Sequence, residues 1–313
     1  MSRVKGLVSV VIPCYNHGDY ILDTVQSVLD QTYKNYEVFI VDDGSDDLQT
    51  RKVIWELDHP QIKVLRKVNG HVSSARNHGI RFSTGEFILS LDSDDQFTPD
   101  FLEKAVPILN QDLDTGAVTC YANVFDHKGH ITSHHKTGGG TSDFLAENNS
   151  MASALFRYQC WEETGGYNES YNATTKGFED WDFWLMVTRA GWKIHSIPEY
   201  LIHYRKAPHS MSQQYENEVP AMMKQLVLKH EDVYRENVAE IIYQKELLIA
   251  QLKNNAEACK NSLTYRLGHT LLYPLKPIWS MLKTKKPITG NSLYTNQPKL
   301  EITCNEKEDL SVS

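Results

Sequence analysis

The stretch FILSLDSDDQFTPD, residues 87–100, joins an apolar run to a cluster of carboxylates. Residues 87–91 have the composition of a buried strand, and Asp92, Asp94 and Asp95 follow it directly. Carboxylates packed this closely repel one another, and their pKa values rise unless a cation or hydrogen-bond donors lie between them. The pattern therefore predicts a strand whose carboxyl end carries a charged site.

Around this stretch, short apolar runs alternate with amphipathic ones between residue 7 and about residue 120. Runs rich in Val, Ile, Leu and Phe predict strands at 7–13, 36–43, 62–67, 86–92 and 117–122. Apolar residues at helical spacing predict helices at 19–31, 71–83 and 98–109, the last with Thr98 as N-cap and Pro99 at its first position. Alternating strands and helices indicate an α/β fold with a Rossmann-like, mostly parallel sheet flanked by helices. Ligands bind at the carboxyl ends of the strands in such sheets.

The rest of the chain divides by composition. Residues 126–150 are rich in glycine, histidine and polar residues and predict a mobile loop beside a site. From Pro220 to about Ala258 the apolar spacing predicts one long helix or two shorter ones. We therefore expect a main domain over 1–212, a helical extension over 213–258, a basic amphipathic segment over 259–289 and a disordered tail over 290–313.

Overall composition excludes several classes of protein. The formal net charge of -8 argues against a nucleic-acid partner. The five cysteines lie far apart and include no C-x-x-C pair, which indicates neither a disulfide framework nor a zinc site. The apolar run at the N-terminus is too short for a signal sequence, and no later run has the length of a membrane span. We expect a cytoplasmic protein.

Six segments occur in an order and approximate spacing that identify a family. They are VSVVIPCYN, SVLDQTYKNYEVFIVDDGSDD, VSSARNHGI, GEFILSLDSDD, TGGYNES and FEDWDFWLMV. Over about residues 7–212 the chain resembles glycosyltransferase family 2. The resemblance implies the A-type glycosyltransferase fold and an inverting enzyme that takes a sugar from a nucleotide-sugar donor. The absence of a Q-x-x-R-W motif implies the addition of one sugar at a time.

The resemblance also assigns the donor side of the site. Donor-binding roles are implied for Pro13, Tyr15, Asn16, Asp43, Ser73, Arg76 and Asp92. Asp43 would accept a hydrogen bond from a pyrimidine N3-H, which favours UDP or dTDP, and Arg76 would face the diphosphate. Asp94 would bind Mn2+ or Mg2+ directly, with Asp92 and His209 as further candidate ligands, because these cations prefer oxygen and complete their shells with phosphate.

On the acceptor side, the resemblance identifies Asp180 as the base that deprotonates the attacking hydroxyl. Acceptor contacts are implied for Gly166, Tyr167, Glu179 and Trp181. For Asp182 we prefer a structural role in the first turn of the helix, where a carboxylate is favoured by the helix dipole. The alternative for the whole chain is an inactive nucleotide-sugar-binding or scaffolding protein on the same fold.

The segment 259–286 differs from the rest of the chain in charge. It holds six Lys or Arg residues and no Asp or Glu, interleaved with Leu, Tyr and Trp. This composition suits a helix that lies on an anionic membrane surface. We expect peripheral binding at the inner face of the cell membrane, a glycan or lipid-linked acceptor, and a role in cell-surface polysaccharide synthesis. The alternative is packing on the main domain, or pairing with a second subunit through the preceding helix.

Overall fold

The computed structural model describes residues 3–126, 129–171, 177–206 and 216–262. A nine-stranded sheet forms its centre, in the order β3-β2-β1-β4-β8-β6-β9-β5, with β7 paired to β6. The strands are β1 (Val4–Cys14), β2 (Tyr36–Asp42), β3 (Ile62–Arg66), β4 (Gly85–Ser90), β5 (Gln96–Phe97), β6 (Thr115–Asp126), β7 (Gly129–His134), β8 (Ala154–Arg157) and β9 (Lys193–Arg205). His209 and residues 263–313, which include most of the basic segment, lie outside the described residues.

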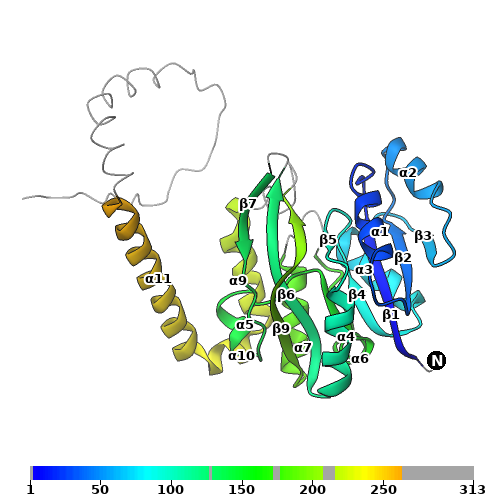
Figure 1. The fold of residues 1–313 in the computed structure, drawn as a ribbon. Helices are drawn as coiled ribbons and strands as arrows, with labels where there is room; N and C mark the ends of the chain where they lie inside the picture. Colours follow the sequence, from blue (N-terminus) through cyan, green and yellow to red (C-terminus); the bar gives the residue numbers. More distant parts are fainter. Residues whose placement is uncertain (1–2, 127–128, 172–176, 207–215, 263–313) are drawn as a thin grey trace, which may run out of the picture. The chain divides into compact units, whose positions relative to one another are not determined.

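The helices lie on both faces of the sheet (Figure 1). They are α1 (Ile21–Leu29), α2 (Leu48–Trp55), α3 (His71–Phe82), α4 (Phe101–Gln111), α5 (Asp143–Ala146), α6 (Tyr158–Thr164), α7 (Glu179–Arg189), the 3-10 helix η1 (Glu216–Glu218), α9 (Val219–Lys229), α10 (Glu231–Glu236) and α11 (Val238–Asn261). The expected α/β fold is thereby confirmed, as is the expected start of a helix at Glu179.

Pairing in the sheet changes from parallel to mixed along its width. Strands β3, β2, β1 and β4 pair in parallel, which confirms the sheet predicted from the alternating runs. Beyond β4 the short strand β8 runs antiparallel to both of its neighbours, whereas β6 and β9 are parallel to each other. The carboxyl ends of β1, β2 and β4 therefore lie at one edge of the sheet.

Two buried clusters cover the two faces. Because successive side chains of a strand point to opposite faces, Val10 belongs to one cluster and Val11 to the other. Helices α1, α2 and α4 contribute to the first cluster, and α3, α5, α6, α7, α9 and α10 contribute to the second. Helix α3 approaches the sheet closely through Gly79, where an added Cβ would lie 2.5 Å from a methyl group of Val11. Helices α3 and α7 thus share one face.

Several elements differ from the sequence predictions. Helix α2 was not expected, and α4 begins at Phe101 rather than at Pro99, because the Thr98 hydroxyl donates to the Asp100 carboxylate at 2.7 Å and fixes a turn before the helix. The range 126–150, predicted as a mobile loop, contains β7 and α5 among its described residues. The region from Pro220 to about Ala258, for which the apolar spacing predicted one long helix or two shorter ones, contains parts of three helices, α9, α10 and α11.

The C-terminal helices begin inside the main compact unit, which spans Met1–Leu248. Asp182 of α7 is fully buried, and its carboxylate accepts from His230 Nε2 at 2.7 Å and from Lys229 Nζ at 2.5 Å. This buried pairing holds α9 and α10 against α7, which is a structural role as predicted for Asp182, although the partners are side chains rather than the helix dipole. A second unit begins at Ile249 within α11.

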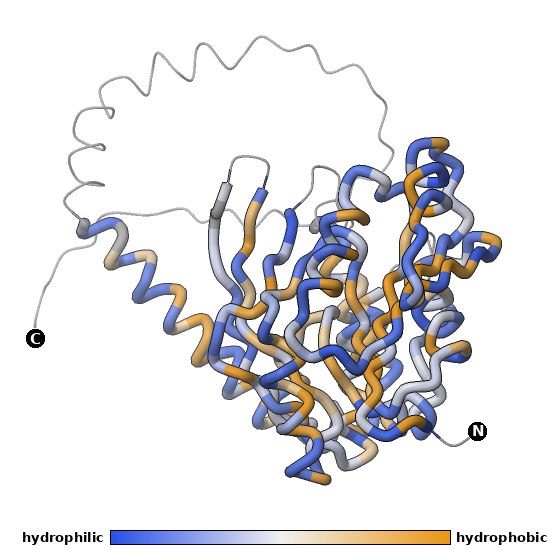
Figure 2. The backbone as a smooth tube through the Cα atoms, turned by 45° about the vertical axis from the view of Figure 1, so that its right-hand side comes forward, coloured by the Kyte–Doolittle hydropathy of each residue, from blue (hydrophilic) through white to orange (hydrophobic). Residues whose placement is uncertain are grey.

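Along α11, hydrophobic residues alternate with hydrophilic ones (Figure 2). Large apolar side chains remain exposed on it, among them Val238, Ile242, Tyr243 and Leu252. In the part of the chain that the structure describes, every helix is too short or too polar to cross a bilayer.

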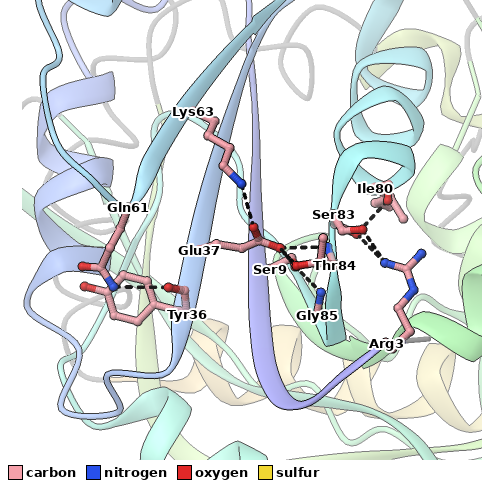
Figure 3. Close-up of polar contacts among 10 residues, drawn as sticks. All are labelled: Arg3, Ser9, Tyr36, Glu37, Gln61, Lys63, Ile80, Ser83, Thr84 and Gly85. Carbon is pink, nitrogen blue, oxygen red and sulfur yellow. Dashed lines mark hydrogen bonds and ion pairs between the residues drawn. The ribbon is translucent and has the colours of Figure 1, made fainter. Parts of the chain in front are cut away.

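At the amino edge of the parallel strands a partly buried carboxylate connects three strands (Figure 3). The Glu37 side chain of β2 accepts from Ser9 Oγ of β1 at 2.8 Å, from the Thr84 backbone N-H at 2.8 Å and from Lys63 Nζ of β3 at 3.2 Å. Burial opposes ionisation of Glu37, but these donors outweigh it and hold its pKa below the usual value. This carboxylate has a structural role, in contrast with those at the opposite edge.

Candidate active site

The carboxylates predicted to form a site lie at the carboxyl edge of β2 and β4. The backbone N-H of Asp43 donates to Cys14 at the end of β1 at 2.9 Å, and the N-H of Leu91 donates to Val11 at 3.0 Å. Asp43 follows β2, and Asp92 and Asp94 follow β4. The structure therefore brings the two acidic segments to the same edge, as expected for parallel strands.

Arg76 of α3 connects the Asp92 carboxylate with helix α7. Its side chain is 1% exposed, Nη2 donates to Asp92 Oδ1 at 2.7 Å, and Nη1 donates to Glu179 Oε1 at 3.1 Å. Burial disfavours the charged guanidinium, but the two carboxylates outweigh it and raise the pKa of Arg76. Arg76 thus holds two acids from distant segments together, and its contact with the diphosphate stays a prediction.

The three carboxylates after β4 have different surroundings. Asp95 is fully buried and accepts from the Arg205 backbone N-H at 3.0 Å and from Ser153 Oγ at 3.2 Å, which fixes the end of β9. The backbone carbonyl of Asp94 accepts from Arg205 Nε at 3.1 Å, but its carboxylate receives no hydrogen bond or ion pair from the side chain of another described residue. Burial and the neighbouring Asp92 raise the pKa of Asp94 to about 6. Its carboxylate is therefore a charged group that lacks a counter-charge in direct contact.

These residues fit a divalent cation of the Mg2+ or Mn2+ type. Only Oδ1 of Asp92 contacts Arg76, so Oδ2 of Asp92 is available to bind a cation. Both carboxylate oxygens of Asp94 are available as well. Within the described ranges no three His, Cys, Asp or Glu side chains are grouped as a complete metal site. Such a cation needs only one or two protein carboxylates when phosphate oxygens supply other ligands. Asp94 and Asp92 would hold it, and the candidate ligand His209 lies outside the described residues.

The predicted base Asp180 lies in the first turn of α7, next to Glu179. Asn148 Nδ2 donates to Asp180 Oδ2 at 2.8 Å. Burial raises the pKa of Asp180 above its usual value, and Arg76 opposes that effect. Burial and the adjacent Asp180 raise the pKa of Glu179 to about 7. A carboxylate whose pKa is raised towards neutrality is a stronger base, as general-base catalysis requires.

The loop after β1, predicted to line the nucleotide, is anchored to the loop after β2. Asn16 adopts a left-handed conformation with φ 56°, and its Oδ1 accepts from the backbone N-H groups of Asp46 and Asp47, both at 3.1 Å. Tyr15 is 43% exposed, whereas Pro13 is buried. Asn16 therefore has a structural role that the sequence did not reveal, and Tyr15 presents a ring beside the edge of the sheet.

Asp43 and Ser73 are both buried. Lys67 Nζ donates to Asp43 Oδ1 at 2.7 Å, and the Gly70 backbone N-H donates to the same oxygen at 3.0 Å. The Ser73 hydroxyl is buried and has no hydrogen-bond partner among the described residues. Asp43 Oδ2 keeps only a longer contact of 3.2 Å with Gly70, so it retains the capacity to accept a further donor.

Three of the residues predicted on the acceptor side, Gly166, Tyr167 and Trp181, are buried. Tyr167 is 2% exposed and stacks on Phe183 at 4.2 Å between ring centroids, and Trp181 is 8% exposed and donates to the Phe144 backbone carbonyl at 2.6 Å. Gly166 has φ 84°, and a Cβ there would lie 2.5 Å from Trp161 Nε1. These three residues shape the wall behind Glu179 and Asp180, and their contact with an acceptor stays a prediction.

Two residues beside the site were not identified from the sequence. Asn148 contacts Asp180 from the segment predicted as a loop, and no spacing in that segment marks it. His17 Nδ1 lies 2.7 Å from Ser93 Oγ, between Asp92 and Asp94 in the sequence. His17 follows Asn16 directly in PCYNHGDY. Its position next to residues predicted to line the nucleotide was therefore the signal in the sequence that could have identified it.

Comparisons with known proteins agree with this geometry. The model of the family described as "Glycosyl transferase family 2" matches residues 9–175. Chondroitin synthase of Escherichia coli is 32% identical over 61% of this chain, but the match spans only 28% of that protein's length. The putative teichuronic acid biosynthesis glycosyltransferase TuaG of Bacillus subtilis is 30% identical over 68% of this chain and 84% of its own.

Among solved structures, residues 1–349 of TarS from S. aureus, in complex with UDP-GlcNAc, share the fold. The superposition has a TM-score of 0.56 and 21% identity, and covers 66% of this chain and 60% of that one. The family model matches more than half of the 313 residues and includes both acidic strand ends. The chain belongs to glycosyl transferase family 2.

Proposed function

We propose that this protein transfers one sugar, with inversion, from a UDP- or dTDP-sugar to a hydroxyl group of a glycan or lipid-linked acceptor. The observation that carries the proposal is the contact of Arg76 with both Asp92 and Glu179. Through this contact Asp92, which we propose for the donor side, is linked to the first turn of α7, where Asp180 lies. Donor and base must be adjacent in a single-displacement transfer, because the hydroxyl attacks as the nucleotide leaves.

On the donor side, Asp43 would accept the N3-H of a uracil or thymine through Oδ2, and Tyr15 would cover the base. Uracil and thymine both carry this N3-H, so a carboxylate here suits pyrimidine carriers. Asp94 and Asp92 would hold Mg2+ or Mn2+, which when bound neutralises charge on the leaving diphosphate. The known complex of TarS with UDP-GlcNAc supports a UDP-sugar as the donor.

On the acceptor side, Asp180 would take the proton of the attacking hydroxyl. The raised pKa of its carboxyl makes it a better base, and its hydrogen bond to Asn148 limits its rotation. Glu179 is engaged by Arg76 and would orient the start of α7 rather than exchange protons. Gly166, Tyr167 and Trp181 would support the acceptor from behind this turn.

The relatives support a role in the synthesis of bacterial cell-surface polysaccharide, since TuaG is named for teichuronic acid biosynthesis. The basic segment 259–286 would hold the protein at the inner face of the membrane, near a lipid-linked acceptor. The exposed apolar side chains of α11 would serve pairing with a second copy. Association with the membrane would concentrate enzyme and acceptor on one surface.

The experiment is a panel of UDP- and dTDP-sugars, with nucleotide release measured with Mn2+, with Mg2+ and with a chelator. We expect slow release with water as the acceptor, for at least one donor, that is lost when the chelator is added. Binding of nucleotide without release under every condition would instead favour the inactive binding protein. Since Asp92, Asp94 and Asp180 are all present, that outcome is not the one we expect.

A further inference from the structure

Asp180 is attached to a second polar group besides the one around Arg76. Asn148 Nδ2 donates to Asp180 Oδ2 at 2.8 Å, and Lys136 Nζ donates to the backbone carbonyl of Asn148 at 2.6 Å. Both residues belong to the segment between β7 and β8. The candidate base is therefore linked through Asn148 to an ammonium group from a different part of the chain.

The segment that carries Lys136 is itself held in place. The backbone carbonyl of Lys136 accepts a hydrogen bond from Ser196 Oγ of β9. Two residues later, the backbone N-H of Gly138 donates to the Asn149 carbonyl at 2.9 Å. Gly138 has φ 67°, and an added Cβ would lie 2.2 Å from the Ile194 carbonyl oxygen. The backbone at Lys136 and just after it is thus fastened to β9 and to the residue after Asn148.

The acids in this part of the site outnumber the cations. Asp180, Glu179 and Asp92 are three acids, whereas Arg76 and Lys136 are the two cations that act on Asp180. Arg76 is shared between Asp92 and Glu179 through direct ion pairs. Lys136 forms no ion pair with a carboxylate among the described residues; burial lowers the pKa of its ammonium group, and Asp180 and Glu147 oppose that effect. Of these two cations, Arg76 is already ion-paired with other acids, whereas Lys136 is not paired with a carboxylate among the described residues.

We propose that Asn148 and Lys136 are positioning residues for Asp180, in which the amide fixes the direction of the carboxylate and the ammonium holds Asn148 and keeps the carboxylate ionised. The inference rests on the proposed function in one respect, the use of Asp180 as the base. With Oδ2 held by Asn148, Oδ1 is directed to accept the proton of the acceptor. Removal of the Lys136 charge would favour the protonated carboxyl and so remove the base at mildly acidic pH.

The direct test is a carboxyl NMR titration of the full chain with labelled aspartate, in which the Asp180 signal is assigned from Asp180→Asn. Lys136→Met should move the pKa of Asp180 upward by roughly half to one pH unit, less than for a cation in direct contact. Lys136→Arg should restore the wild-type titration, since it keeps the charge. Lys52→Met is the matched control, because Lys52 is a 73% exposed lysine of α2 whose removal changes the net charge equally.

A second variant tests the amide. Asn148→Ala should also raise the pKa of Asp180, because a hydrogen bond to the charged form is lost. A purely structural role would lower thermal stability in these variants without moving the titration. If Lys136→Met and Asn148→Ala both titrate as the wild type does at Asp180, the inference is wrong.

Release of UDP from UDP-GlcNAc, with water as the acceptor, gives the functional readout. In Lys136→Met the acidic limb of the pH profile of kcat should move to higher pH, while the affinity for UDP stays unchanged. In Lys136→Arg and Lys52→Met the acidic limb should stay at the pH of the wild type. Should no UDP- or dTDP-sugar be turned over by the wild type, the proposed function fails, while the NMR titration still decides the role of Lys136. A shifted titration with an unshifted activity profile would show that Asp180 is not the base.

Discussion

Replacement of Arg76 by methionine tests the contact that joins the two halves of the site. Methionine keeps most of the length of the side chain and removes its charge. Asp92 and Glu179 would then lose their ion pairs of 2.7 and 3.1 Å, while their side chains are only 27% and 17% exposed. The variant leaves two acids close together without a counter-charge.

The expected cost follows from this burial. Removal of one partner from a buried ion pair destabilises a protein by about 3–5 kcal/mol. We expect about 3 kcal/mol, at the lower end, because Asp92 retains access to water and Glu179 can take up a proton. Without the guanidinium the pKa of Glu179 rises further above its unfolded value, so the loss of stability should be larger at about pH 8 than at about pH 6.

Urea denaturation followed by tryptophan fluorescence measures this loss, since Trp181 and Trp184 are buried in α7. Arg81→Met is a matched control on the same helix. Arg81 pairs with Glu169 at 3.0 Å, but it is 54% exposed, so its removal should cost less than about 1 kcal/mol. If Arg76→Met loses no more stability than Arg81→Met, the inference that Arg76 holds the two segments together is refuted.

Three further predictions concern other parts of the chain. Asp94→Asn should abolish the stimulation of nucleotide release by Mn2+ and lower turnover by at least about 100-fold, because the leaving diphosphate loses its counter-charge; near-normal stimulation would exclude Asp94 as the metal ligand. Glu37→Gln should cost about 2 kcal/mol of unfolding free energy near pH 7. Since the pKa of Glu37 is lowered by folding, the wild type should lose this advantage as the pH falls through that lowered pKa; a constant difference in urea midpoints would contradict it. Truncation after Ala258 should remove salt-sensitive binding to anionic lipid vesicles while release of UDP is retained, and equal vesicle binding by both forms would exclude the basic segment as the membrane contact.

The sequence predicted the parts of the fold that depend on local pattern. Five apolar runs became β1, β2, β3, β4 and β6. Four of these strands are largely buried on both faces, which selects Val, Ile and Phe, whereas β3 lies at the edge of the sheet and is partly exposed. The rule that parallel strands present their carboxyl ends at one edge predicted that Asp43 and Asp92 lie at the same edge. Local pattern and one topological rule were sufficient for this.

The partners of each charged side chain could not be predicted in the same way. Arg76 lies 103 residues before Glu179, and no periodicity relates the two. Asn148 and Lys136 lie in a polar, glycine-rich segment whose composition resembles a mobile loop, yet its backbone bonds to β9 hold it in place. Such contacts are set by tertiary packing, which a single sequence does not encode in its spacing.

The central claim, that this family member transfers sugar with Asp180 as its base, is tested most directly by Asp180→Asn. The change is nearly isosteric and removes only the basic group. We predict that affinity for UDP in the presence of Mn2+ is unchanged, while turnover of the UDP-sugar falls by roughly 100- to 10,000-fold, the range for a positioned general base. Turnover near the wild-type value, or a loss confined to UDP binding, would contradict the account.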